Sequence, residues 1–268
     1  MVMRSGRITR THNLRLLVFF GILVAILVIS SLVLKFISLA RESRFDGEHF
    51  FVVSFLRSEQ ADIVGFDPKT RTIVLLHTTG NAKRSSLKQT LGIPIDGEVY
   101  GEAVSDHSIP STLLRIFFRY QMMQTDLTII DIGRLAFFAK TVSQSDIAEK
   151  ALSLSKDEAS IENIVASMFI DPAIKEEKLD VEIVNASGVS GLGQRLERVL
   201  SHIGGNVVAV TTSPKIMSVS SIVYFGKKTY TLSKMQRIID IPISYTEKPR
   251  LADITIVLGE DIVKTKQF

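Results

Sequence analysis

The stretch DVEIVNASGVSGLGQRLERVL, residues 180–200, decides how the C-terminal part of the chain folds. An apolar alternation ends at Asn185, a loop with three glycines follows, and Leu192, Leu196 and Leu200 then recur at helical spacing. The pattern predicts a strand, a glycine turn and a helix in direct succession.

A turn of this kind is where a phosphate-binding fingerprint would lie. That fingerprint requires G-x-G-x-x-G, because the first glycines make the tight turn and let the backbone approach a pyrophosphate. Gly188, Gly191 and Gly193 give G-x-x-G-x-G instead, and residues 209–213 (AVTTS) offer no carboxylate for a ribose. We therefore favour glycines that turn the chain and let the helix pack closely on its strand, with a phosphate cradle as the alternative.

A membrane span is predicted near the N-terminus. Residues 16–34 (LLVFFGILVAILVISSLVL) carry no charge, and as a helix they span about 28 Å, close to one hydrocarbon core. We expect a transmembrane helix over residues 16–38. A cleaved secretory signal is the alternative, with residues 38–40 (SLA) as the nearest approach to a cleavage site.

The charges around this span predict its orientation. Residues 1–15 contain Arg4, Arg7, Arg10 and Arg15 and no acid, whereas the residues after the span carry mixed charges. The positive-inside rule makes residues 1–15 a cytoplasmic basic tail and places the rest of the chain outside the cytoplasm.

The overall charge excludes several classes of function. Subtracting the four arginines from 32 Lys+Arg leaves 28, which equals the 28 Asp+Glu of the chain, so the part beyond the span is neutral and we expect no nucleic-acid partner. The chain has no cysteine, and histidines 12, 49, 77, 107 and 202 fall in no ligand spacing. We expect no metal site and no cofactor.

Residues 48–171 are predicted to form a first α/β module. Strands are expected at 49–56, 61–66 and 71–77, an extended segment at 92–100, and helices over 111–123, from Thr128 with a capping box to Asp131, and from Ser155 with a capping box to Glu158. Asp171-Pro172 is expected to end the last helix. Residues 172–178 are charged without an apolar period, so we place a domain boundary there.

A second α/β module is predicted over residues 179–262. Strands at 181–184, 206–210, 221–225 and 253–258 and helices at 192–203 and 230–239 make two β-α-β units. The fold class is therefore α/β, with an N-terminal transmembrane helix followed by two small extracytoplasmic modules.

The second module carries a family resemblance. VEIVNASGVSGLGQRLERVLSHIGG, SSIVYFGKKTYTLSKMQRI and ADITIVLGED follow one another in order and resemble the LytR C-terminal domain of LytR-CpsA-Psr cell-envelope proteins. The resemblance covers residues 179–262. It implies that the glycine turn belongs to an envelope module.

The first module resembles the LytR-CpsA-Psr catalytic domain in two segments. ADIVGFDPKTRTIVLL resembles its early strand-turn-strand, and GIPIDGEVY resembles its Gly-Ile-Pro-Ile-Asp segment. Active members transfer glycan polymers from polyprenyl-pyrophosphate carriers to peptidoglycan. However, Thr78-Thr79-Gly80-Asn81 stands where the family has Ile-Pro-Arg-Asp, and the later arginine-rich segment has no counterpart. The resemblance therefore implies a degenerate domain.

Seven residues are candidates for ligand binding, and none is predicted to be catalytic. Asp62 occupies the position of the family's first-strand acid and Arg57 precedes it, so the two could form a residual anion or metal site; we favour a solvated Asp62 that caps its strand. Arg115 and Arg119 share one helix face, which suits either a phosphate or a solvated stripe. The envelope module contributes Asn185, Gly188 and Gly191.

The sequence predicts a single-pass, non-catalytic binding or scaffolding protein of the cell envelope. Its expected partners are the membrane, wall glycan or polyprenyl-linked glycan, and other envelope proteins. Two alternatives stay open: a divergent phosphotransferase that uses Arg57 and Asp62 with Arg115 or Arg119, and a protein-protein assembly module whose interface would be an exposed apolar patch.

Overall fold

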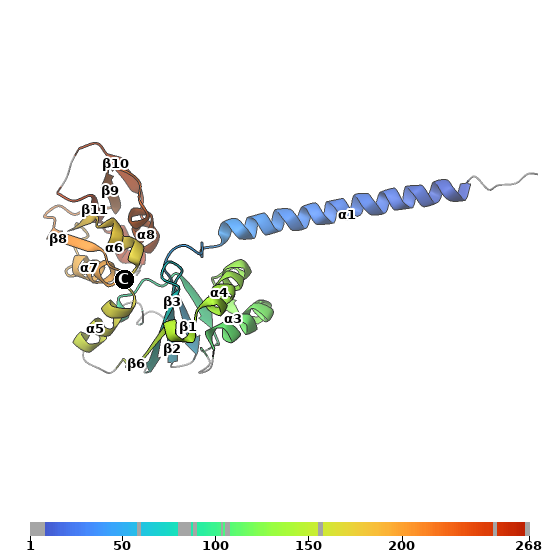
Figure 1. Ribbon diagram of the computed structural model, residues 1–268. Helices are drawn as coiled ribbons and strands as arrows, with labels where there is room; N and C mark the ends of the chain where they lie inside the picture. The colour runs from blue at the N-terminus through green and yellow to red at the C-terminus, as the bar shows by residue number, and fades with distance from the viewer. Residues whose placement is uncertain are drawn as a thin grey trace, which may run out of the picture.

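The computed structural model describes residues 9–57, 60–79, 87, 90–102, 104, 108–154, 158–248 and 251–265. Helix α1 (Thr9–Glu42) projects from the rest of the protein as one long rod (Figure 1). Its segment Leu16–Glu42 is long and apolar enough to cross a membrane and buries none of its apolar window against the protein.

The first module is built on a six-stranded sheet in the order β5-β4-β1-β2-β3-β6. Strands β1, β2 and β3 form an antiparallel meander, while β4 joins β1 and β6 joins β3 in parallel. The predicted hairpin is confirmed. The bounds are β1 Phe51–Arg57, β2 Gln60–Asp67, β3 Thr72–Thr79, β4 Gly97–Tyr100, β5 Gln124–Thr125 and β6 Ile147–Ser153.

Helices cover both faces of this sheet (Figure 1). On one face α3 (Ile109–Phe118) and α4 (Ile129–Thr141) enclose a core with Phe45, Phe55 and Phe66. On the other face α5 (Glu158–Met168) contributes three of its apolar residues and is followed by Phe169 in the same cluster. Short 3-10 turns at Tyr120–Met122 and Gln144–Asp146 follow α3 and α4.

One predicted capping box is confirmed, and α5 ends at Met168, before Asp171-Pro172 as predicted. Thr128 and Asp131 cap α4 reciprocally, whereas Ser155 lies outside the described residues. Residues 172–178, where the domain boundary was predicted, contain α6 (Pro172–Glu177) with Asp171 as its N-cap. Asp171-Pro172 therefore begins a helix, because proline suits the first helical turn and the aspartate accepts from the Ala173 N–H.

The second module is built on a five-stranded sheet in the order β10-β9-β11-β7-β8. Both predicted β-α-β units are present, but the second one closes on β10, which was not predicted, and β11 lies between β7 and β9. The bounds are β7 Asp180–Asn185, α7 Leu192–His202, β8 Asn206–Thr212, β9 Ser221–Phe225, α8 Tyr230–Ile239, β10 Ile243–Thr246, β11 Ile254–Leu258 and α9 Asp261–Thr265.

Candidate functional site

The predicted acid Asp62 is buried within the first sheet. Its side chain lies on β2, with the residue 5% exposed, so the expectation of a solvated cap is wrong. Oδ1 lies 2.7 Å from His77 Nδ1 on the adjacent strand, and Oδ2 accepts the Val104 N–H at 2.8 Å. These two hydrogen-bond partners take the place of the water molecules that the carboxylate loses when it is buried.

His77 extends this contact into a chain of three side chains. Its second ring nitrogen, Nε2, lies 3.0 Å from Glu149 Oε1 on β6. Each imidazole nitrogen thus faces a carboxylate oxygen. In this arrangement Asp62 holds both His77 and the backbone at Val104.

The predicted arginines do not join Asp62. Arg57 ends β1 at an exposed position, and among the described residues no contact connects it to Asp62. Arg115 and Arg119 lie on one exposed side of α3, as their spacing predicts, but Arg115 Nη2 pairs with Glu102 Oε2 at 3.0 Å. Among the residues that the structure describes, these three arginines therefore form no clamp around the predicted acid.

In the second module the glycine turn is organised by its own side chains. Asn185 is buried, donates from Nδ2 to the Val189 carbonyl at 2.8 Å and accepts from Ser187 Oγ at 2.7 Å. Gly188 and Gly191 adopt φ of +77° and +79°, the left-handed region that favours glycine. The side chain of Asn185 is thus turned into the loop.

Gly193 explains how closely the following helix packs. A Cβ atom placed on it would lie 2.9 Å from Val210 Cγ1, closer than real contacts allow. The first turn of α7 therefore rests directly on the strands β7 and β8. These observations agree with glycines that serve the turn and the helix packing.

Sequence reasoning missed a buried ion pair between the modules. Lys234 on α8 places Nζ 2.8 Å from Asp96 Oδ1 and also donates to the Phe50 carbonyl at 3.3 Å. Asp96 Oδ2 accepts the Val52 N–H at 3.0 Å. Asp96 is the aspartate of the segment GIPID, which carries part of the family resemblance. Its partner Lys234 is 138 residues away, so no pattern in the sequence near Asp96 indicates the pair.

A second polar contact lies beside this pair. Tyr230 on α8 donates its hydroxyl to Asp171 Oδ2 at 2.7 Å and stacks on the His49 ring, with ring centroids 3.9 Å apart. Burial raises the pKa of Asp171, although the Tyr230 hydrogen bond and the charge of Lys234 oppose the rise. Burial and the neighbouring Asp171 raise the pKa of Tyr230. Both groups therefore hold their protons more tightly than in water.

Helix α7 adds a further contact to the first module. His202 is buried, and its Nδ1 lies 3.1 Å from the carbonyls of Leu91 and Gly92. Arg198 donates to the Thr90 carbonyl at 3.0 Å and pairs with Glu162 on α5. Burial and the nearby Arg198 charge lower the pKa of His202, so the neutral ring is favoured there.

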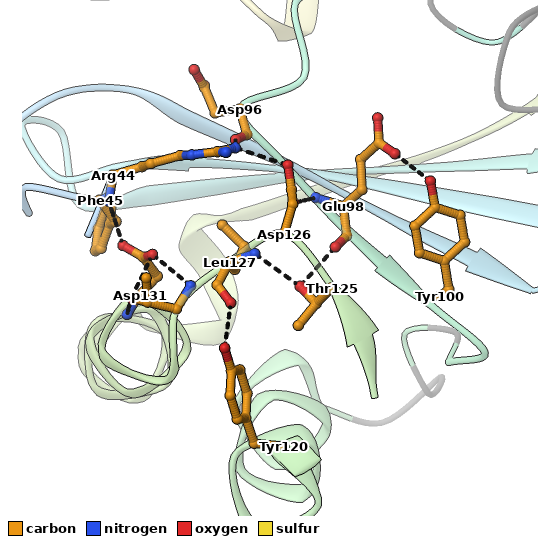
Figure 2. Close-up of polar contacts among 11 residues, drawn as sticks. Arg44, Phe45, Asp96, Glu98, Tyr100, Tyr120, Thr125, Asp126, Leu127 and Asp131 are labelled. Atoms are coloured by element: carbon orange, nitrogen blue, oxygen red, sulfur yellow. Dashed lines mark hydrogen bonds and ion pairs between the residues drawn. The ribbon is translucent and has the colours of Figure 1, made fainter. Parts of the chain in front are cut away.

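The junction between α1 and the first module converges on Asp131 (Figure 2). This fully buried carboxylate accepts five hydrogen bonds, from Ser43 Oγ, the Arg44 and Phe45 N–H groups, and the Thr128 N–H and Oγ1. Burial alone would raise the pKa of Asp131, but these hydrogen bonds outweigh it and lower the pKa. We call this cluster the Asp131 clasp.

Arg44 reinforces the clasp from the other side. Its Nη1 donates to the Asp96 carbonyl at 3.0 Å and to Asp126 Oδ2 at 2.8 Å (Figure 2). Asp126 in turn accepts the Glu98 N–H at 2.7 Å. The segment after α1 is therefore tied to the same Asp96 that binds Lys234.

Comparison with known proteins identifies the second module. Residues 178–261 match the family model of the LytR C-terminal domain, described as LytR cell envelope-related transcriptional attenuator. The second module is therefore a LytR C-terminal domain, as the sequence motifs predicted. The residues before 178 lie outside this match, so the degenerate catalytic domain over residues 48–171 stays a prediction. No curated protein sequence matches the chain.

Three solved structures show weak likeness to the chain. Lin1025 from Listeria innocua has 10% identity and a TM-score of 0.31, covering 44% of this chain and 95% of its own. Lmo1026 from Listeria monocytogenes, described as a transcriptional factor, has 11% identity and a TM-score of 0.31, covering 47% and 94%. TagT from B. subtilis has 12% identity and a TM-score of 0.19, covering 84% and 91%. These TM-scores are too low to carry an argument.

Proposed function

We propose that the protein is a single-pass, non-catalytic binding or scaffolding component of the cell envelope, linked to the attachment of glycan polymers to the wall. Its LytR C-terminal domain associates it with the envelope. Helix α1 is its membrane anchor, with residues 1–15 in the cytoplasm and both modules outside. Wall glycan or polyprenyl-linked glycan is the expected ligand.

One observation carries the non-catalytic part of the proposal. Asp62, Asp67, Asp96 and Glu98 are buried carboxylates in the two segments that resemble the catalytic domain, and all four are engaged internally, by His77, Thr70, Lys234 and Tyr100 respectively. A phosphotransferase would need carboxylates that hold a metal and guanidinium groups that clamp a pyrophosphate. Here the carboxylates bind other residues of the protein, and among the described residues Arg57 has no contact with them.

The proposal is tested by a transfer assay on the full chain in nanodiscs. The chain receives a polyprenyl-pyrophosphate glycan, a peptidoglycan acceptor and magnesium. We expect no transfer above the protein-free background, and no change in Asp62→Asn or Arg57→Ala. Sedimentation of the same discs with purified wall should retain the protein. Transfer that disappears in Asp62→Asn would instead establish the divergent phosphotransferase.

Orientation has its own test. A reporter fused after Phe268 should be active only outside the cytoplasm, since the arginines before the span keep the N-terminus inside. A reporter active in the cytoplasm would remove both modules from the envelope.

A second candidate function rests on an apolar patch of the LytR C-terminal domain. Val189, Ile216, Met217 and Val219 surround the glycine turn and are between 36% and 59% exposed. An envelope protein that docks on this patch would make the domain an assembly module. Cross-linking from a Met217→Cys label, compared between the chain with Ile216 and an Ile216→Asp variant, distinguishes this candidate from glycan binding.

A further inference from the structure

Large apolar side chains are exposed on the two helices beside the membrane anchor. Phe118 at the end of α3, Met122 in the following turn and Phe137 on α4 are 81%, 84% and 74% exposed. Each of these side chains leaves apolar area in contact with water. Phe118 and Phe137 belong to one helix pair because α3 packs on α4, and Met122 lies in the 3-10 turn that follows α3. A helix pair whose outer surface faces only water would gain no stability from such exposed apolar side chains.

Basic residues accompany these apolar residues. Arg119 follows Phe118 directly, and Lys140 lies one turn beyond Phe137; both side chains are exposed. Helices that lie in a membrane interface combine phenylalanine or leucine with lysine or arginine in this way, because the rings enter the acyl boundary while the cations meet lipid phosphates. We call Phe118, Arg119, Met122, Phe137 and Lys140 the aromatic-basic surface.

The Asp131 clasp fixes where this surface lies relative to the anchor. Phe137 follows Asp131 by six residues on the same helix, about 9 Å along its axis. Helix α1 contacts α4, and Figure 1 shows α3 and α4 on the side of the sheet from which α1 leaves. Glu42 follows Leu34, the last residue of the uncharged stretch 16–34, by only eight positions, about 12 Å of helix. The surface therefore lies close to the headgroup layer that α1 enters.

We propose that the aromatic-basic surface rests on the membrane that α1 spans. Phe118, Met122 and Phe137 enter the boundary between headgroups and acyl chains, and Arg119 and Lys140 bind the phosphates of anionic lipids. The inference rests on the proposed role of α1 as a membrane anchor. It adds a second, peripheral contact that sets the orientation of the first module on the bilayer.

Site-specific labels test the proposal on the full chain, which has no cysteine of its own. Phe118→Cys and Phe137→Cys each carry an environment-sensitive fluorophore in nanodiscs of anionic phosphatidylglycerol. We expect a blue-shifted emission, quenching by nitroxide-bearing lipids and protection from aqueous iodide. Leu251→Cys is the matched control, because Leu251 is equally exposed at 75% but lies in the second module. Its label should be quenched by iodide alone.

A label inside the anchor separates failure of this inference from failure of the proposed function. If Leu27→Cys is quenched by nitroxide lipids while Phe118→Cys and Phe137→Cys are quenched only by iodide, the span stands and the surface contact is wrong. If the two surface labels are protected from both quenchers, a protein covers them and the lipid contact is wrong. If Leu27→Cys is not quenched by lipid, the anchor itself fails.

The lipid phosphates have a separate test. The double variant Arg119→Gln/Lys140→Gln should reduce lipid quenching of the Phe137→Cys label in phosphatidylglycerol discs, and it should have no effect in zwitterionic phosphatidylcholine discs. Lys227→Gln/Lys228→Gln, an exposed pair in the second module, is the control and should change neither. Equal quenching with and without Arg119 and Lys140 in anionic discs would overturn the phosphate contact.

Discussion

Lys234 Nζ lies 2.8 Å from Asp96 Oδ1, and the side chains are 3% and 5% exposed between the two modules. One charge comes from the LytR C-terminal domain and the other from the segment GIPID of the first module. A buried charge is tolerated when a partner and further hydrogen bonds compensate it, and the Phe50 carbonyl and Val52 N–H provide these bonds. The pair therefore couples the stability of the two modules.

Lys234→Met should destabilise the full chain by about 3–5 kcal/mol, because it leaves the Asp96 carboxylate buried without its counter-charge. The double variant Lys234→Met/Asp96→Asn should recover a large part of this loss. Denaturant unfolding in detergent, followed by circular dichroism, measures both. The matched control is Lys69→Met: Lys69 pairs with Glu176 across the modules at exposed positions, where loss costs about 0–1 kcal/mol. Equal effects of Lys234→Met and Lys69→Met would contradict the coupling.

Asp131→Asn should loosen the junction below α1. An amide can retain one oxygen acceptor but must turn an NH₂ group toward donors, so we expect a loss on the order of 2–4 kcal/mol. Protease cleavage near Ser43 should increase in parallel. Asp146→Asn, at an exposed position, serves as the control.

The lowered pKa of Asp131 also predicts an acid dependence. Because the folded-state pKa lies below the unfolded value of about 3.9, the stabilisation is complete above that pH and is lost as the pH falls toward the folded pKa. Asp131→Asn should therefore flatten the stability profile below about pH 4. An unchanged acid profile in Asp131→Asn would argue against a charged clasp.

His202 should make the contact between modules sensitive to milder acid. Its folded pKa is lowered from an unfolded value of about 6.5, so its contribution is complete above that pH and is lost as the pH falls toward the folded pKa. Melting temperatures of wild type and His202→Gln should converge on acidification below about pH 6.5, because glutamine keeps a donor for the Leu91 and Gly92 carbonyls but does not titrate. A constant difference between the two proteins would rule out this role.

The glycine turn gives two separable predictions. Gly193→Ala should cost about 1–3 kcal/mol, because the new methyl group meets Val210 Cγ1. Gly191→Ala meets no neighbour but must hold a left-handed φ of +79°, which costs about 1–2 kcal/mol. Gly191→Asn should recover part of the second loss and none of the first, as thermal unfolding of the three variants can show. Wild-type stability in Gly193→Ala would mean that α7 packs less closely than described.

Local patterns predicted most of the elements that carry an apolar signal. The meander of the first sheet and helices α7 and α8 follow from periodicity, and Thr128 with Asp131 marks the start of α4. Strand β6 was missed because four of its seven residues are exposed and it has no apolar alternation. It becomes a strand because β3 offers it an edge for parallel pairing, which no local pattern indicates.

The polar interior could not be predicted from one sequence. Lys234 stands beside apolar residues of an amphipathic helix and resembles an ordinary polar-face lysine. Asp62 resembles a solvated strand residue until His77 and Val104 are placed beside it. In both cases the deciding partner comes from another segment, and the free energy of burying a charge depends on that partner rather than on local sequence.

The Asp131 clasp leaves no flexible segment between the membrane helix and the folded body. A flexible linker would let the LytR C-terminal domain sample a broad volume above the bilayer. The clasped junction is instead a rigid connection, so a ligand bound by that domain would stay at one distance from the membrane. A force on the ligand would then tilt α1 within the lipid.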